Sequence, residues 1–442
     1  MVTAWWCERA WLPGSGVTDG VLFETEDGRI AAITVGISPP AGAGRLPGLV
    51  VPGFANTHSH AFHRALRGRS QRNAGDFWAW RDLMYDVAAR LDPDSYYALA
   101  RATYAEMALA GITSVGEFHY LHHAPDGVRY NDANAMGHAL MHAAASAGIR
   151  ITLLDTCYLT GGFDQPLQGA QLRFGDGSAD EWGSRVEQLT VVDGSRVGAA
   201  IHSVRAVPLG DAEIVAGAAK RNGWLLHMHV SEQRAETEQC LAARARTPTQ
   251  VLSDVGALTP NSTVVHATHL GDGDISLLTR SGSGVCLCPT TERDLADGIG
   301  PAGLLAGHGV SLSLGSDSHA VIDLLEEARA MEMHERLVTN RRGRFDAAAL
   351  LRAASLDGHR ALGWLDAGDL SIGTRADFVA IDLESVRTAG GGPTLDAAMF
   401  AATAADVTDV VVDDRYVVRD RQHLLVDDVA AELTKSIRAV LP

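Results

Sequence analysis

The middle of the chain alternates short apolar runs with longer stretches in which apolar residues recur at helical spacing. The first run begins at residue 50, and the others span 112–118, 150–155, 197–202, 224–230, 263–267, 284–288 and 310–315. Strands that alternate with helical patterns predict βα units and a parallel sheet. Eight such units predict an α/β fold, a (β/α)₈ TIM barrel whose chemistry lies where its strands end.

The connections between these runs are long enough for helices. In the stretch 94–111 we expect Asp94 to cap the start of a helix and Gly111 to stop it. At both chain ends, short apolar runs alternate with turns and not with helical stretches. Runs at 20–25 and 29–33 flank an Asp-Gly pair, a strong hairpin signal, and further strand-like runs follow at 376–382, 407–412 and 416–418. We therefore predict that residues 1–49 and 368–442 form a small β-sandwich domain beside a barrel of residues 50–367.

Composition restricts the partners. The 442 residues are 46% hydrophobic, and a formal net charge of −17 argues against a nucleic acid or an anionic membrane as partner. No stretch resembles a secretory signal or a membrane helix, so we expect a cytoplasmic protein. The five scattered cysteines fit reduced, buried thiols better than a disulfide framework, and Cys286 and Cys288 are assigned to core packing.

Polar side chains gather at the predicted strand ends. They are His58, His60, Tyr120, His202, Arg205, His229, Glu232, His266, Ser316 and Asp317. Residues two apart on a strand share a face, so His58 and His60 direct two imidazoles toward one point. Imidazoles and a carboxylate at one barrel mouth are the ligands that a catalytic zinc requires. Any one of these residues could instead be a hydrogen-bonded core residue, but four agreeing strand ends favour a metal site.

Four motifs at these strand ends, PGFANTHSH, HMHVSE, VHATH and GSDSH, resemble the amidohydrolase superfamily, and GTRADFVAID resembles its usual β appendage. The resemblance covers nearly the whole chain. It implies a barrel of the metal-dependent hydrolase type that binds one divalent metal ion, Zn²⁺ by preference, through His58, His60, His229 and Asp317. His227 shares a strand face with His229, but the family pattern of a histidine followed three residues later by a glutamate selects His229.

A second set of motifs is similar to the formimidoylglutamate deiminase family within that superfamily. It includes HSHAFHRALRG, FWAWRDLMY, GEFHYLHH, IHSVRAV and CPTTERDLADG. The resemblance implies hydrolysis of N-formimidoyl-L-glutamate to N-formyl-L-glutamate and ammonia in histidine degradation. The chain departs from the family pattern at His63, where glutamine is usual, and at Asp294, where asparagine is usual.

The expected roles follow from the chemistry of metal-assisted hydrolysis. Zinc lowers the pKa of bound water from 15.7 to about 7, and Asp317 is the candidate base beside that water. His266 would stabilise the developing charge, and Glu232 would carry a proton to the leaving nitrogen. The expected substrate-binding residues are Arg81, Tyr120, His202, Arg205, His63 and Ser316. The glycine-rich loop 161–177 is expected to form a lid from which Arg173 reaches the ligand, whereas His122 and His123 are expected to be exposed.

Alternatives stay open at this point. Another mononuclear amidohydrolase, one that deaminates a purine, a pyrimidine or a related amidine, would be favoured by aromatic stacking walls in place of two arginines. A barrel that had lost catalysis is a further alternative, which the complete ligand set disfavours. Iron or manganese could occupy the same ligands. The expected partner is a small dicarboxylate amidine, and we expect a homodimer because barrels of this type often associate.

Overall fold

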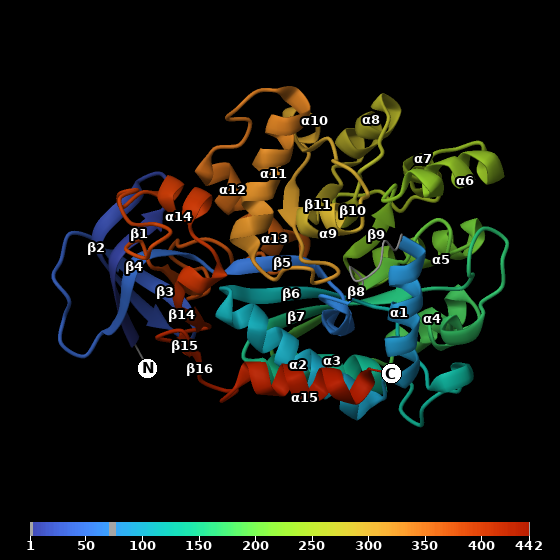
Figure 1. The fold of residues 1–442 in the computed structure, drawn as a ribbon, viewed down its shortest axis with the longest axis horizontal. Helices are drawn as coiled ribbons and strands as arrows, with labels where there is room; N and C mark the ends of the chain where they lie inside the picture. The colour runs from blue at the N-terminus through green and yellow to red at the C-terminus, as the bar shows by residue number, and fades with distance from the viewer. Residues whose placement is uncertain (1–2, 70–76, 442) are drawn as a thin grey trace.

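The computed structural model describes residues 3–69 and 77–441, with side chains from residue 80 onward in the second range. Its strands form two eight-stranded sheets. Figure 1 shows one sheet as a central barrel of strands surrounded by helices. The other sheet forms a smaller layer on one side, where blue and red segments from the two chain ends lie together. The predicted α/β barrel with a β domain from both termini is therefore confirmed.

The barrel is a nearly closed parallel sheet whose strands follow one another in chain order. Its strands are β5 (Phe54–Ser59), β6 (Ile112–His119), β7 (Arg150–Cys157), β8 (Ser195–Ile201), β9 (Leu226–Val230), β10 (Ser262–His266), β11 (Gly284–Leu287) and β12 (Leu312–Leu314). All eight predicted strands are present. The end of the first strand and the segment just after the last strand meet at a parallel bridge between Ser59 and Asp317.

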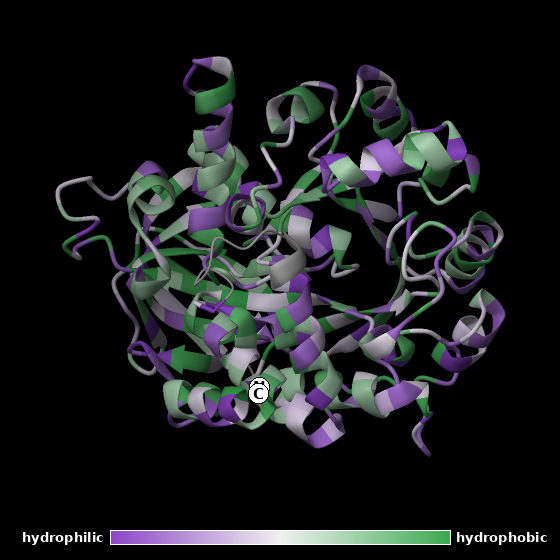
Figure 2. Cartoon of the chain, turned by 45° about the vertical axis from the view of Figure 1, so that its right-hand side comes forward, coloured by the Kyte–Doolittle hydropathy of each residue, from purple (hydrophilic) through white to green (hydrophobic). Residues whose placement is uncertain are grey.

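Helices cover the outside of the barrel, as expected for βα units. They are α1 (Phe77–Arg90), α2 (Pro93–Leu109), α3 (Ala135–Ala147), α4 (Ala179–Val186), α5 (Leu209–Asn222), α6 (Arg234–Arg244), α7 (Pro248–Asp254), α8 (Asp272–Ser281), α9 (Pro289–Asp294), α10 (Ala302–Gly307), α11 (Leu324–Thr339), α12 (Ala347–Ala354), α13 (Leu356–Ala361), α14 (Leu395–Ala401) and α15 (Val429–Val440). Figure 2 shows mostly apolar strands inside and mixed polar and apolar turns on the surrounding helices.

The start of α2 corrects one expectation. Asp92, not Asp94, is the N-cap: its carboxylate accepts from Ser95 N at 2.8 Å, and the Ser95 hydroxyl closes the capping box. Pro93 takes the first helical position, where a missing N–H costs nothing, so the helix begins one residue before Asp94. Gly111 follows the helix with φ +85°, a conformation that favours glycine.

The small domain is one curled sheet in the order β16-β15-β14-β13-β4-β1-β2-β3. Its strands are β1 (Thr3–Leu12), β2 (Gly16–Glu26), β3 (Arg29–Thr34), β4 (Gly44–Pro52), β13 (Phe378–Ile381), β14 (Val407–Val412), β15 (Arg415–Arg419) and β16 (Gln422–His423). The predicted Asp27-Gly28 hairpin joins β2 to β3, with both residues at positive φ. The sheet folds over its own core, where the rings of Phe23 and Phe378 lie 5.0 Å apart.

A buried ion pair and the passage of the chain from one sheet to the other are among the contacts that join the small domain to the barrel. Arg150, at the start of β7, is buried and binds Asp377 through both terminal nitrogens, and it also lies 3.0 Å from Asp413. At the seam between the sheets, β4 ends at Pro52 and β5 begins at Phe54. The C-terminal helix α15 packs along α2 on the outside of the barrel (Figure 1).

All five cysteines lie within the described residues, and each is free and buried, which agrees with the expected reduced thiols. In the described ranges, no helix combines the length and the apolar character that crossing a membrane requires.

We expect Asp377→Asn to destabilise the fold because it leaves the buried Arg150 guanidinium with Asp413 as its remaining carboxylate partner. Breaking a buried ion pair costs roughly 3–5 kcal/mol, and the retained Asp413 places this change at about 3 kcal/mol. The measurement is the free energy of unfolding in urea. Asp382→Asn is the matched control, because its partner Arg421 is half exposed and such pairs contribute about 1 kcal/mol or less. Equal losses in the two variants would contradict the role given to Arg150.

Candidate metal centre and active-site cavity

The site is built on the seam where β12 closes against β5. The Asn56 side chain makes two bonds across it: Nδ2 donates to Ser316 Oγ at 2.7 Å, and Oδ1 accepts from Ser316 N at 2.9 Å. Asp317 N donates to the His58 carbonyl at 3.0 Å, and His60 N donates to the Asp317 carbonyl at 3.3 Å. A Cβ at Gly315 would lie 2.8 Å from the His58 Cβ, so only glycine allows this approach. The seam therefore fixes Asp317 beside the two histidines of β5.

The backbone turns sharply at two of the strand ends. Asp317 has φ +40° and His266 has φ +70°, in the left-handed region that residues other than glycine seldom adopt. Such conformations persist where surrounding bonds hold them, and they concentrate at functional sites. Here they turn the two side chains into the barrel mouth.

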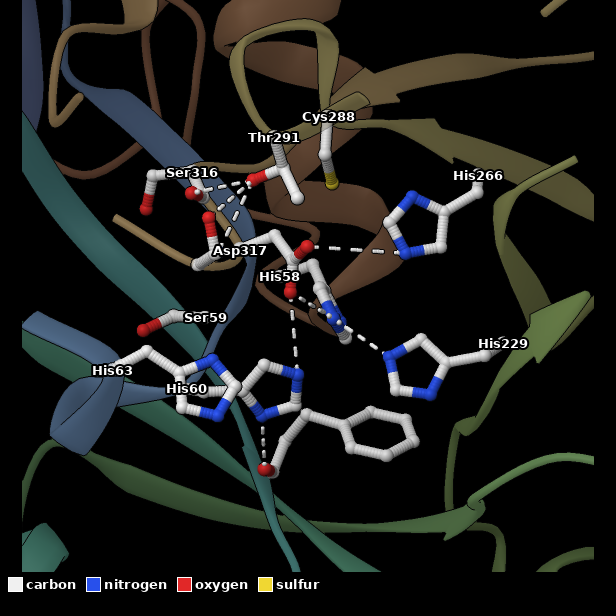
Figure 3. Close-up of polar contacts among 12 residues, drawn as sticks. His58, Ser59, His60, His63, His229, His266, Cys288, Thr291, Ser316 and Asp317 are labelled. Atoms are coloured by element: carbon white, nitrogen blue, oxygen red, sulfur yellow. Dashed lines mark hydrogen bonds and ion pairs between the residues drawn. The ribbon is translucent and has the colours of Figure 1, made fainter. Parts of the chain in front are cut away.

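Four side chains converge at this mouth, and they are the four that the sequence predicted as metal ligands (Figure 3). His58 Nε2 and His229 Nε2 lie 3.0 Å apart. Asp317 Oδ1 lies 3.2 Å from His58 Nε2 and 3.3 Å from His60 Nε2. Ligands about 2.1 Å from a tetrahedral zinc lie roughly 3.4 Å from one another, so these separations fit an ion of that size.

Backbone carbonyls orient two of the imidazoles. His60 Nδ1 donates to the Phe118 carbonyl and His229 Nδ1 donates to the His202 carbonyl, each at 2.9 Å. Each bond places the remaining hydrogen on Nδ1 and leaves the Nε2 lone pair facing the common centre. Metal-binding histidines are held in this way in known sites.

The protonation states also suit a cation. Burial lowers the pKa of His58 to about 3 and holds that of His229 well below its usual value. Burial raises the pKa of Asp317, but hydrogen bonds from His58 and His60 outweigh it and hold that pKa well below the usual range. Neutral imidazoles and an ionised carboxylate are the forms that bind a metal.

The three predicted catalytic residues face one another. His266 Nε2 lies 3.9 Å from Asp317 Oδ2 and 3.8 Å from Glu232 Oε1. Burial lowers the pKa of His266, but Glu232, a hydrogen bond to Glu292 and the charge of Asp317 together raise it well above its usual value. Burial raises the pKa of Glu232, against the opposing effect of His266. A raised carboxyl pKa suits a residue that must carry a proton near neutral pH.

A cavity opens above this centre, and most of the predicted substrate residues line it. They are Arg81, Tyr120, His202, Arg205 and His63, together with Glu232, His266 and Asp317. His63 Nε2 lies 2.8 Å from the Tyr120 hydroxyl, so the residue that departs from the deiminase pattern is fixed against another predicted contact. Burial lowers the pKa of Arg205, but Tyr158 and two glutamates outweigh it, so the net pKa is raised and the guanidinium stays charged.

Ser316 does not line this cavity. It is fully buried in the seam, and its hydroxyl bonds to Asn56 and to His319 Nδ1. Arg173 is also buried, and its guanidinium donates to the carbonyls of Ala88, Leu91 and His123. It therefore ties the 161–177 loop to α1 and to the segment after β6, and it does not reach the cavity as expected.

The expectation that His122 and His123 are exposed is wrong. Both are about 1% exposed. His123 Nε2 lies 3.0 Å from Asp176, and His122 Nε2 donates to the Thr156 carbonyl at 2.9 Å. Asp176 in turn binds Arg185, so the two histidines belong to a buried polar network beneath the loop.

Several residues of the site had no assignment from the sequence. Glu292 accepts from His266 Nδ1 at 3.4 Å, and Tyr158, Tyr85, Phe174 and Trp80 add aromatic surface to the cavity. Glu292 lies in the motif CPTTERDLADG, so the motif indicated the right segment without indicating a role. A larger cavity of about 830 Å³ lies at the opposite end of the barrel, where strands begin, and contains none of the predicted site residues.

Comparison with known proteins agrees with this site. The amidohydrolase family model matches residues 49–417. The formimidoylglutamate deiminase of Pseudomonas aeruginosa is 38% identical, with 96% of each chain covered. The 5-methylthioadenosine/S-adenosylhomocysteine deaminase of Halobacterium salinarum is 27% identical, over 97% of this chain and 95% of its own. The resemblance inferred from the motifs is thereby confirmed.

Solved structures support the fold. An amidohydrolase from Brucella melitensis superposes with a TM-score of 0.91 at 32% identity, covering 99% of each chain. An adenosine deaminase from Xanthomonas campestris with bound zinc superposes with a TM-score of 0.85 at 24% identity, covering 99% of this chain and 97% of its own.

Two histidines on one strand allow a direct test of the ligand assignment. We expect His229→Gln to lose the bound metal because one of four ligands is removed, and His227→Gln to keep it because His227 Nε2 instead bonds the Ala361 carbonyl. The measurement is the zinc content per chain after purification with zinc present, with circular dichroism to check folding. Retained zinc in a folded His229→Gln protein would contradict the assignment.

Proposed function

The chain belongs to the amidohydrolase family and is a metal-dependent hydrolase of the deaminase type, and on that premise we propose that it deiminates N-formimidoyl-L-glutamate. Water adds to the amidine carbon, the bond from that carbon to the terminal nitrogen breaks, and N-formyl-L-glutamate and ammonia leave. The observation that carries the proposal is the pairing of a three-histidine, one-aspartate centre with two arginines in one cavity.

Asp317, His266 and Glu232 each have a separate role in the proposed reaction. When bound, a zinc ion supplies a Lewis acid that polarises the reacting centre and makes water acidic near neutral pH. Asp317 takes a proton from the attacking water, and His266 hydrogen-bonds the oxygen as charge develops on it. Glu232 reaches the same space from the end of β9 and delivers a proton to the departing nitrogen, so that it leaves as ammonia.

Two arginines in the cavity suit a substrate that carries two carboxylates. Arg205 and Arg81 line the cavity in a protein with a formal net charge of −17, so an anionic substrate is bound through local cations and not through a general positive field. A guanidinium binds a carboxylate through two parallel hydrogen bonds, which fixes orientation as well as affinity. Tyr120 and His202 line the same cavity, with their rings 5.2 Å from that of His60 and 5.1 Å from that of His229 respectively, and would contact the amidine end.

One observation favours a second candidate function. The cavity also presents the aromatic rings of Tyr85, Tyr120, Tyr158, Phe174 and Trp80, which offer the stacking surface that a purine or pyrimidine requires. The cavity therefore combines both features that were expected to discriminate the two functions. The two arginines favour the dicarboxylate, because a guanidinium binds a carboxylate through two parallel hydrogen bonds, and a neutral purine or pyrimidine has no carboxylate to accept them.

Ammonia release from the zinc-loaded protein tests the assignment. We expect turnover of N-formimidoyl-L-glutamate and at most weak turnover of adenosine, 5-methylthioadenosine and guanine. Preference for any purine would replace the proposed substrate with the second candidate.

Arg205→Met should reveal which substrate feature Arg205 binds. Loss of a charge-assisted hydrogen bond costs about 1.5–3 kcal/mol, so we expect kcat/KM for N-formimidoyl-L-glutamate to fall roughly 10- to 100-fold. Turnover of formamidine, which has no carboxylate, should change little. Arg293→Met serves as control, because Arg293 is exposed and pairs with Glu326 on the surface. Equal losses for both substrates would remove carboxylate binding from the role of Arg205.

Glu232→Gln should slow the chemical step while keeping the metal. General acid–base catalysis contributes roughly 10²–10⁴-fold, so we expect kcat to fall by that range with zinc content unchanged. The measurement is the steady-state rate of ammonia release, and Glu238→Gln, exposed on α6, is the matched control. Unchanged turnover would show that another group carries the proton.

A further inference from the structure

A second group of potential metal ligands adjoins the first. It consists of His266, Cys288 and Asp317, all buried, whose ligand atoms lie within 4.8 Å of one another. Figure 3 shows the Cys288 sulfur directed toward the space between Asp317 and His266. Asp317 belongs to both groups: Oδ1 faces His58 and His60, whereas Oδ2 faces His266. One carboxylate therefore separates two clusters of donors.

The two clusters differ in size and in donor type. The separations measured in the first are 3.0–3.3 Å, but His266 Nε2 and Asp317 Oδ2 lie 3.9 Å apart. Since ligands of a tetrahedral zinc lie roughly 3.4 Å apart, the second cluster is wide for zinc. It also contributes a sulfur, and soft thiolate ligands select soft metal ions. Width and softness together favour an ion that is larger and more thiophilic than Zn²⁺.

We propose that His266, Cys288 and Asp317 form a second, inhibitory cation site that binds a soft divalent ion of the Cd²⁺ class while zinc stays in the first site. The ion enters through the cavity that His266 and Asp317 line. It displaces the thiol proton of Cys288 and the Nε2 proton of His266 to solvent as the two ligands coordinate, because a coordinating thiol and a coordinating imidazole are deprotonated. Glu232 Oε1, 3.8 Å from His266 Nε2, can act as a fourth donor from the cavity side.

Occupation of this site stops turnover because it engages groups that the reaction needs. His266 Nε2 and Asp317 Oδ2 are the atoms that face the attacking water in the proposed reaction, and an ion bound to them removes both a hydrogen-bond donor and a proton acceptor. The inhibition does not depend on which amidine or ring the enzyme hydrolyses.

The other histidine-containing group of donors in the described chain illustrates what such a site needs. His119, His122 and Asp155 are equally close together and buried. However, both oxygens of Asp155 accept from the Arg185 guanidinium at 2.8 Å, and Trp182 donates to one of them. That carboxylate is already neutralised by a guanidinium, whereas in the second cluster Oδ2 of Asp317 faces the imidazole of His266, 3.9 Å from its Nε2.

The test adds Cd²⁺ to the zinc-loaded protein and measures zinc and cadmium per chain, the ultraviolet cadmium–thiolate charge-transfer band, and ammonia release. We expect one zinc to be retained, about one cadmium to be gained, the band to appear and activity to be lost. Cys288→Ser and Cys288→Ala should keep zinc, lose the band, and require at least about 10-fold more Cd²⁺ for half inhibition. Cys240→Ser, a buried cysteine on α6, should behave like the unmodified chain.

Two results would overturn the proposal. One is replacement of zinc by cadmium in a one-for-one exchange. The other is a band and a cadmium content that persist in both Cys288 variants. Zinc content reports whether each variant keeps the first site intact, and both metal readouts are independent of the substrate. Failure of the deiminase proposal would leave them unchanged.

Discussion

The closure of the barrel between its first and last strands is the constraint on which the site depends. Two ligands, His58 and His60, come from β5, and Asp317 comes from the loop after β12, some 260 residues later in the chain. Backbone bonds between these segments and the two bonds of the Asn56 amide hold the carboxylate against the imidazoles. A metal site tolerates only small errors in ligand position, so rigid closure of the sheet is part of the chemistry.

Carboxylates with different surroundings give this mouth its catalytic character. Asp317 is held ionised by hydrogen bonds from histidines, whereas burial raises the pKa of Glu232. Pairs of titratable groups whose environments push their pKa values apart are typical of acid–base catalysis. His266 lies between Asp317 and Glu232, and a hydrogen bond from its Nδ1 to Glu292 orients the ring. The thiol of Cys288 also lies close to Asp317, the carboxylate that the proposed reaction uses as a base.

The sequence predicted much of this structure because two of its signals are local. Alternating strand and helix patterns identified all eight barrel strands, and the strand ends gave the candidate site residues, since a TIM barrel brings strand ends together wherever they lie in the chain. The family motifs then selected the four ligands among these candidates. The misplaced residues depend on three-dimensional contacts that no local pattern contains. His122, His123 and Arg173 are polar residues in loops, where exposure is the usual outcome, yet buried partners fix all three. Ser316 follows a strand end, where site residues are expected, but its hydroxyl is hydrogen-bonded to Asn56 in the seam between β12 and β5.

The pairing of β4 with β13 has a consequence for synthesis on the ribosome. These antiparallel neighbours, Val51 and Val379 among their paired residues, are separated by more than 300 positions, and every barrel strand is translated between them. Domains generally fold as units as they emerge, but this small sheet cannot be completed until the last tenth of the polypeptide has left the exit tunnel. Its N-terminal strands must wait with an unpaired edge at β4, so the nascent chain passes through a stage in which that edge is open to chaperones or to the wrong partner.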